Sequence, residues 1–361
     1  MSTKKLKIPL QQISFLLIIL LIFVRYYSTR PIFKNGDLVK ITSKVYNEPL
    51  VFDKQQYFKI QSLKVYLPKY PTVNYGDIVV ITGTISGDKL VSPKLLEIKE
   101  TSNVFYKMRQ KLIFFYKSNL PEPMASLVAG IVIGSKNMPE EFWDKLKATG
   151  TAHVVVASGT NVSLLAGFLI SSLTIFLSRK YAVFIAIAGI GIYVIISGFD
   201  APIVRAGIMG CILFLGQEKG RLINTWRILI YSALIMLLVK PVWITDLGFI
   251  LSFVATISLL IFQKPIDSRL KFVPNILREG LSTSLAAQIG VAPIIFVTFG
   301  KFNILSPIIN ALILWTVSFI MILGALSGVI GLIVPIFGKM MLYVLYPLLW
   351  YFVNIVGIFN F

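Results

Sequence analysis

Apolar runs of membrane-spanning length recur along the chain, and most of them lie beyond Met124. The first run, Ile13 to Val24, comes earlier and is followed by Arg25. The lysines that precede it are Lys4, Lys5 and Lys7. Basic residues flank membrane helices on the cytoplasmic side, and no small-residue cleavage site follows this run. It therefore predicts an uncleaved membrane anchor over residues 1–29 with a cytoplasmic N-terminus.

Between residues 30 and 101 the pattern changes to short, alternating runs that are rich in β-branched residues. They predict five strands, Gly36–Thr42, Tyr57–Ile60, Leu63–Leu67, Ile78–Ser86 and Lys89–Ile98. Five short strands within about 70 residues predict a small Greek-key barrel of the OB type. Since the preceding anchor has its N-terminus inside, we expect this all-β domain to be extracytoplasmic.

Residues 102–149 predict a transition into the membrane. Asn103–Leu120 has a basic amphipathic pattern, which is typical of a helix lying along the membrane surface. Met124–Ser135 is apolar but short, so it predicts a re-entrant or tightly packed helix. Pro139–Ala148 predicts another short amphipathic helix.

Residues 150–361 predict a polytopic channel domain that begins with the stretch Gly150–Ser178. The further predicted spans are Tyr181–Ile196, Pro202–Leu215, Trp226–Val239, Val242–Phe262, Leu281–Phe299, Ile304–Ile320, Met321–Ile336 and Met340–Ile358. The predicted fold class is a polytopic α-helical membrane protein with a small extracytoplasmic all-β OB-like domain. Basic loops between alternate spans predict a multi-pass protein of the cytoplasmic membrane.

Composition agrees with this class, since 56% of the 361 residues are hydrophobic and the mean hydropathy is +0.79. The net charge of +19 fits cytoplasmic loops, but a basic surface also attracts nucleic acid or anionic lipid. Cys211 is the single cysteine and His153 the single histidine, which excludes disulfide frameworks and multi-histidine metal sites. We therefore expect neither a metal nor a cofactor.

Small and polar residues interrupt the apolar pattern between Gly150 and Asn161. Hydrocarbon penalises unpaired polar groups by several kcal/mol, so this stretch predicts a broken helix beside a cavity. The candidate path residues here are His153, Ser158, Gly159, Thr160 and Asn161. Ser158 has neither a second histidine nor a nearby acid for a catalytic triad, so we do not expect an enzyme.

A second candidate region places Asp200 before Pro202 at a helix start, with Arg205 one turn further on. Asp200 fits a capping role, whereas Arg205 either pairs with Asp200 or presents its guanidinium to a phosphate. Gln288 and Asn310 either tie helices together or line a pore. No P-loop motif and no chain of membrane carboxylates is present, which favours a passive conduit driven by a partner.

The β-rich segment carries aromatic and basic residues that suit single-stranded nucleic acid, which OB barrels bind by stacking bases on aromatic rings. The candidate contacts are Lys40, Lys59, Lys64, Tyr57 and Tyr66. The alternative is that these side chains form only the barrel core and a solvated surface.

Five motifs follow one another along the chain. They are Gly150-x-Ala152-His153-x-x-x-Ala157-Ser158-Gly159, Arg205-Ala206 with Met209, Leu247-Gly248-Phe249-Ile250-Leu251-Ser252-Phe253, the Pro293 segment and Asn310. In this order they resemble the competence domain of ComEC-type DNA channels. The predicted barrel, with Tyr75-Gly76-Asp77 before Gly83, is similar to the OB-like domain of that family.

The resemblance implies an inner-membrane channel that passes single-stranded DNA into the cytoplasm during natural transformation. It also implies a separate DNA receptor, a cytoplasmic motor and, for duplex DNA, a nuclease that degrades the second strand. The chain departs from the family at Asn161, where members usually have a histidine. With one histidine it also cannot form the dinuclear site of the metallo-β-lactamase-like nuclease that many members carry.

Two other functions remain open from the sequence. One is a transporter for a small anionic or lipid-linked substrate, and the other is an intramembrane enzyme. A closed central pocket would favour the transporter, and a requirement for Ser158 in turnover would favour the enzyme.

Overall fold

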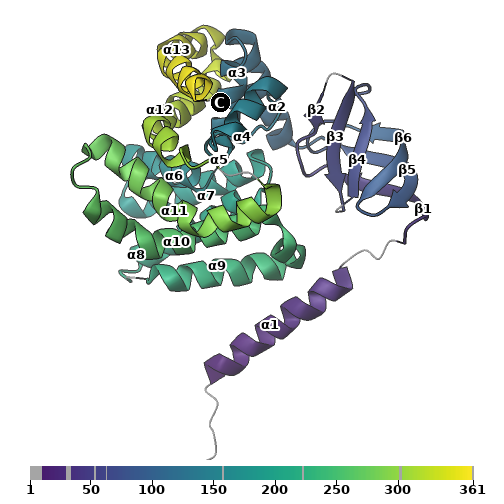
Figure 1. Cartoon of the computed structure of the whole chain (residues 1–361), viewed down its shortest axis with the longest axis horizontal. Coiled ribbons are helices and arrows are strands. Elements are labelled where there is room, and N and C mark those ends of the chain that lie inside the picture. The colour runs from purple at the N-terminus through teal and green to yellow at the C-terminus, as the bar shows by residue number, and fades with distance from the viewer. Residues whose placement is uncertain are drawn as a thin grey trace, which may run out of the picture.

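A computed structural model describes residues 10–29, 34–52, 54–61, 63–156, 158–221, 223–300 and 303–359. Helices make up most of the structure, and a single sheet stands to one side of them (Figure 1). Within the described residues, seven helices are long and apolar enough to cross a membrane. The predicted fold class, a polytopic helical membrane protein with a small β domain, is confirmed. Lys4, Lys5 and Lys7 lie outside the described residues, as does Ala157.

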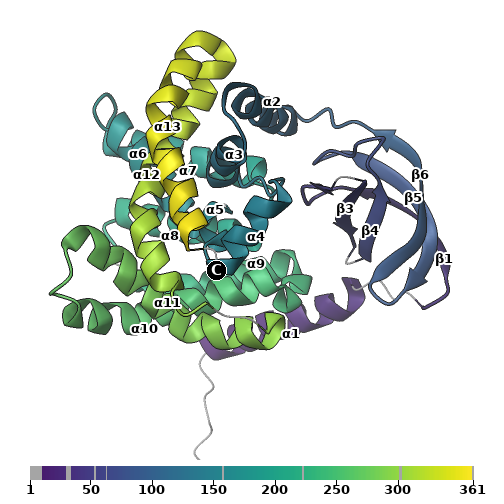
Figure 2. The same ribbon diagram turned by 45° about the horizontal axis from the view of Figure 1, so that its top comes forward.

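The N-terminal apolar run forms α1 (Leu10–Thr29), which lies along one side of the helical part (Figure 2). It packs on α9 (Thr225–Val239) and on the short 3-10 helix η1 (Pro241–Thr245). The guanidinium of Arg25 donates a hydrogen bond to the carbonyl of Leu238 in α9.

The β domain contains six strands instead of the five predicted. They are β1 (Leu38–Lys44), β2 (Leu50–Val51), β3 (Gln55–Ile60), β4 (Leu63–Pro68), β5 (Ile78–Ser86) and β6 (Lys89–Lys99). The additional strand, β2, has two residues, which is too short to give an alternating pattern. The sheet order is β1-β5-β6-β4-β3-β2, and only the β4–β6 pair is parallel. This crossed order is consistent with the OB-like prediction.

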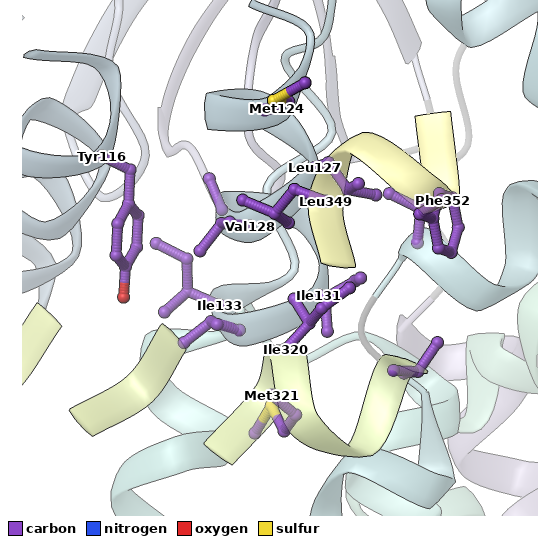
Figure 3. Close-up of a cluster of buried hydrophobic side chains, with 14 of the residues drawn as sticks. Tyr116, Met124, Leu127, Val128, Ile131, Ile133, Ile320, Met321, Leu349 and Phe352 are labelled. Carbon is purple, nitrogen blue, oxygen red and sulfur yellow. The ribbon is translucent and has the colours of Figure 1, made fainter. Parts of the chain in front are cut away.

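Helix α3 (Met124–Ile133) forms the centre of the helical part, and all ten of its residues are buried. This confirms the tightly packed helix predicted there. It is surrounded by α2 (Val104–Asn119), α12 (Ser306–Ile333) and α13 (Pro335–Ile358). Figure 3 shows the packing of Leu127, Val128 and Ile131 against Ile320 and Met321 of α12 and Leu349 and Phe352 of α13.

Glycines on α12 let the neighbouring helices approach it closely. A Cβ atom at Gly324 would lie 2.8 Å from Val132 Cγ2, and one at Gly331 would collide with the Phe115 ring, 2.6 Å from Cε2. Lipid is as apolar as the side chains, so burial alone does not drive helices together in a membrane. Close backbone packing at such glycines supplies the association energy instead.

The predicted spans Ile304–Ile320 and Met321–Ile336 are wrong as two helices, because α12 is one helix of 28 residues. Neither a proline nor a polar residue interrupts the chain at Ile320 and Met321, so helical hydrogen bonding continues. The helix is about 42 Å long, which exceeds the roughly 30 Å of a hydrocarbon core.

The other predicted spans all correspond to apolar helices with shifts at their ends, although α9, with 15 residues, is not among the seven described helices that are long enough to cross a membrane. They are α7 (Arg179–Ile196), α8 (Ala201–Glu218), α9, α10 (Leu247–Arg269), α11 (Asn275–Phe299) and α13. Asp246 caps α10 by accepting a hydrogen bond from Phe249 N at 3.0 Å.

Candidate functional site

The predicted break in the helix after Gly150 is present. A short helix α5 (Ala152–Val155) ends at the extended Val156, and α6 (Gly159–Leu173) begins after Ser158. Ser158 occupies the N-cap position without capping, since its hydroxyl donates to Asn161 Oδ1 at 3.3 Å. No side-chain cap therefore covers the positive end of the α6 dipole.

Asn161 is fully buried in the first turn of α6. Its amide Nδ2 donates to the carbonyl of Ile131 at 2.8 Å, in the last turn of α3. The residue thus ties α6 to the central helix, and its side chain points away from accessible space.

One face of α6 is exposed and carries only small and hydroxyl-bearing side chains. Its residues are Thr160, Ser163, Gly167, Ser171 and Thr174, spaced three or four apart. We call this row the α6 stripe. Ser163 Oγ and Thr174 Oγ1 donate to carbonyls of the same helix, and their oxygens can still accept a hydrogen bond from water or a polar ligand.

The neighbours of α6 show where the α6 stripe lies. A Cβ on Gly159 would meet α8 at Arg205 and Ala206, Asn161 faces α3, and Leu169 packs against Gly189 of α7. The remaining neighbour is α12, which also packs on α3. The exposed face consequently lies between α8 and α12.

Five helices close a circuit around this face. Helix α6 packs on α8, α8 on α10, α10 on α11, α11 on α12, and α12 on α6 again. Among the described residues α6 makes no substantial contact with α10 or α11, which lie across the circuit.

Arg205 of α8 reaches the start of α6. Its Nη1 group donates to the Ser252 carbonyl and the Thr256 hydroxyl of α10, while Nη2 lies 2.8 Å from the point that a Gly159 Cβ would occupy. Its Nε is buried without a hydrogen-bond partner, and no carboxylate within 4.0 Å pairs with the guanidinium in the described chain. A cation without a counter-ion at this depth is characteristic of a functional site.

The alternative pairing of Arg205 with Asp200 is wrong, because Asp200 binds Lys136 Nζ at 2.7 Å. Asp200 occupies the N-cap position of α8, but its carboxylate makes no cap hydrogen bond. No sequence pattern predicted that Lys136, which follows α3, would pair with Asp200.

Gln288 and Asn310 form a second polar cluster on the α11–α12 side of the circuit. Gln288 Nε2 donates to Ser306 Oγ at 2.8 Å, and Asn310 Nδ2 donates to Ser284 Oγ at 3.0 Å. Gly150 joins this cluster, since a Cβ there would lie 2.8 Å from Ser306 Oγ. These contacts connect helices, as one of the two predicted alternatives expects.

The predicted residues therefore separate into distinct groups. Gly159, Thr160 and Arg205 meet at the start of α6, and the exposed His153 lies before them on α5. The prediction omitted Ser163 and gave no role to Thr256. The spacing of Thr160, Ser163 and Gly167 would have identified the α6 stripe as one helical face.

On the β domain, Tyr57 and Tyr66 are cross-strand partners with ring centroids 4.9 Å apart. Lys59 and Lys64 are the next such pair on the same face. Lys64 binds Asp88 at 2.6 Å, and this hydrogen bond lowers the pKa of Asp88 and raises that of Lys64. Lys40 lies on β1, at the other end of the sheet.

Comparison with known proteins identifies relatives of the helical part. The model of the Competence protein family matches residues 131–361. ComE operon protein 3 of Bacillus subtilis (strain 168) is 26% identical over 236 residues, covering 64% of this chain and 30% of that protein. The uncharacterized protein YcaI of Escherichia coli (strain K12) is 27% identical over 213 residues, covering 55% of this chain and 28% of that protein. The matches thus span about 30% of these curated relatives, and no solved structure matches.

Proposed function

We propose, because this chain belongs to the Competence protein family, that its helices form a membrane channel that passes single-stranded DNA into the cytoplasm. One observation carries the proposal. Arg205 is partly buried, pairs with no carboxylate of the described residues and has a buried Nε without a hydrogen-bond partner, and it lies at the start of the exposed α6 stripe, within the circuit of contacting helices.

The chemistry of this place suits a phosphodiester backbone. A DNA strand carries one negative charge per nucleotide, which needs cationic or dipolar stabilisation to enter a low-dielectric region. Arg205 and the positive end of α6 supply such stabilisation side by side. The small hydroxyl groups of the α6 stripe offer hydrogen bonds but no deep pocket, so a strand can bind and still move on.

The arrangement supports a conduit and not an intramembrane enzyme. Ser158, the one candidate nucleophile of the break, donates its hydroxyl proton to an amide oxygen of Asn161. An amide is not a general base, so this contact does not activate the serine.

Blocking the α6 stripe tests the path. In a Cys211→Ser background, Ser163→Cys should react with a bulky water-soluble thiol reagent and thereby lose DNA uptake, measured as transformation by a selectable marker. Val344→Cys is the matched control, because Val344 is 72% exposed and lies on α13, which is not one of the five helices of the circuit. Normal uptake after complete labelling at position 163 would remove the α6 stripe from the DNA path. Blocked uptake of a small anion, with DNA uptake intact, would favour the transporter.

We further propose that the β domain lies outside the membrane and receives the strand on Tyr57 and Tyr66. Replacing both tyrosines with alanine should weaken single-stranded DNA binding by about 5- to 150-fold, since stacking one base contributes about 1–3 kcal/mol. Fluorescence anisotropy with a labelled oligonucleotide on the purified protein measures the change. Lys40→Ala, on the distant edge strand, should have a much smaller effect. Equal losses in both variants would indicate nonspecific charge attraction only.

Partner proteins complete the proposed function. The chain has no nucleotide-binding motif, so the proposed route depends on a cytoplasmic motor. A DNA receptor and a nuclease for the second strand are proposed as separate proteins. We also propose that the N-terminus lies in the cytoplasm, because basic residues precede the N-terminal membrane anchor and flank membrane helices on the cytoplasmic side.

A further inference from the structure

The β domain meets the helical part through a cluster of two ion pairs, in which Arg109 is buried and the other three side chains are partly buried. Glu48 follows β1, Arg109 lies on α2, Lys136 follows α3, and Asp200 precedes α8. Arg109 Nη2 binds Glu48 at 3.0 Å, with 2% and 12% of these side chains exposed. Lys136 binds Asp200 at 2.7 Å. We call these four residues the charge junction.

Arg109 also holds the ends of two helices. Its Nη1 group donates to the carbonyl of Ile133, the last residue of α3, and to that of Ile196, the last residue of α7, the latter at 2.6 Å. Carbonyls at helix ends lack partners within the helix and carry the negative end of the dipole. One guanidinium thus fixes α3 and α7 relative to each other and to Glu48.

Glu48 fixes the turn that follows α3. Its carboxylate accepts hydrogen bonds from Ser135 Oγ at 2.9 Å and from the backbone N–H of Lys136 at 2.6 Å. The same lysine then reaches Asp200 with its side chain. Glu48 of the β domain is thus linked through Lys136 to Asp200, the residue that precedes α8.

Tyr75 adds a neutral contact beside the charges. Burial, together with the neighbouring Tyr106, raises the pKa of Tyr75, so its hydroxyl stays protonated and donates to the Ile195 carbonyl at 3.3 Å. The loop that follows α7 contains Gly198 and Phe199, whose φ values are +96° and +56°. A left-handed phenylalanine is strained and persists only where its surroundings hold it.

Both halves of the candidate site are attached to this junction. Asn161 of α6 is bound to Ile131 in the last turn of α3, whose end Arg109 holds. Arg205 lies five residues after Asp200 on α8, whose start Lys136 holds. The helices that carry Gly159 and Arg205 are therefore both linked to the charge junction.

We infer that the charge junction is a positioning device through which the β domain sets the opening between the start of α6 and Arg205. The role of this device in DNA passage rests on the proposed function, whereas the contacts of the charge junction do not depend on DNA. Displacing Glu48 or separating Lys136 from Asp200 releases the start of α8, and the α6 stripe becomes more accessible.

Thiol labelling without DNA tests this inference. The reporter is Ser163→Cys in the Cys211→Ser background, and the measurement is its reaction rate with a small water-soluble methanethiosulfonate. Lys136→Asp and Asp200→Lys should each raise the rate by about 5-fold or more, the lower end of typical coupling between sites. The double variant restores opposite charges and should return the rate to that of the parent.

Two further variants keep the outcome decisive. Glu48→Gln removes one charge with little change of shape and should also raise the rate, even if charge reversal prevents folding. Lys147→Asp reverses a charge in the exposed pair with Asp144 and should leave the rate unchanged. Unchanged rates in the single variants, or no restoration in the double variant, would overturn the inference. If the proposed DNA path itself were wrong, DNA uptake would instead remain normal after position 163 is blocked.

Discussion

Arg205→Ala should lower DNA uptake by about 30-fold, the factor that corresponds to losing one interaction of about 2 kcal/mol. The substitution removes the one cation placed at the start of α6. The Ser252 carbonyl keeps a partner in the Thr256 hydroxyl, which donates to it at 2.9 Å. Since Arg205 has no acid partner among the described residues, its removal leaves no carboxylate unpaired. The amount of protein in the membrane should therefore stay unchanged.

Comparison of Arg205→Lys and Arg205→Gln separates charge from hydrogen bonding. Lysine keeps the positive charge but loses the planar fork, whereas glutamine keeps a donor for the Ser252 carbonyl and loses the charge. We expect lysine to retain more uptake than glutamine if a phosphate is the ligand. Transformation frequency, normalised to protein level by immunoblot, measures all three variants. Uptake that falls only in proportion to protein level would assign Arg205 a structural role.

Gly338→Ala should destabilise the protein by about 3 kcal/mol, at the upper end of the usual cost of overpacking. A Cβ at this position of α13 would collide with the Gly331 Cα and lie 2.7 Å from the Ser327 carbonyl oxygen on α12. These are backbone atoms, so the clash is relieved only by moving the two helices apart. The α12–α13 pair also encloses α3, and the displacement should reach the core.

Gly357→Ala provides the matched control on the same helix. A Cβ at Gly357 meets nothing within 4 Å, and alanine favours helix by about 1 kcal/mol over glycine. This variant should be as stable as the parent or slightly more stable. Thermal unfolding in detergent, followed by tryptophan fluorescence, distinguishes the two substitutions. Equal unfolding temperatures for both variants would show that α12 and α13 can separate without cost.

Local patterns predicted the elements whose signals are local. Alternation predicted β3 to β6, and polar residues within an apolar run predicted the break between α5 and α6. The continuity of α12 was missed because an apolar run contains no mark of where one span ends, and only a proline, glycine turn or charge would have divided it.

The charge junction could not be predicted from the sequence. Glu48 lies 61 residues from Arg109 and 88 from Lys136 along the chain. A single lysine after α3 resembles any loop cation, and Asp200 resembles an ordinary cap. Their pairing depends on how the β domain sits on the helices, which no short-range pattern encodes. The exposure of the α6 stripe likewise follows from the arrangement of its neighbours.

The central helix α3 has a consequence for how the chain is made. At ten residues it is about 15 Å long, too short to be recognised as a span when it leaves the ribosome. Its partners Ile320 and Leu349 lie about 190 and 220 residues further along the chain. Translation must therefore pass through most of α13 before α3 acquires its full surroundings, and until then α3 stays at the bilayer surface or beside a helper protein. The core of this protein closes last during its biogenesis.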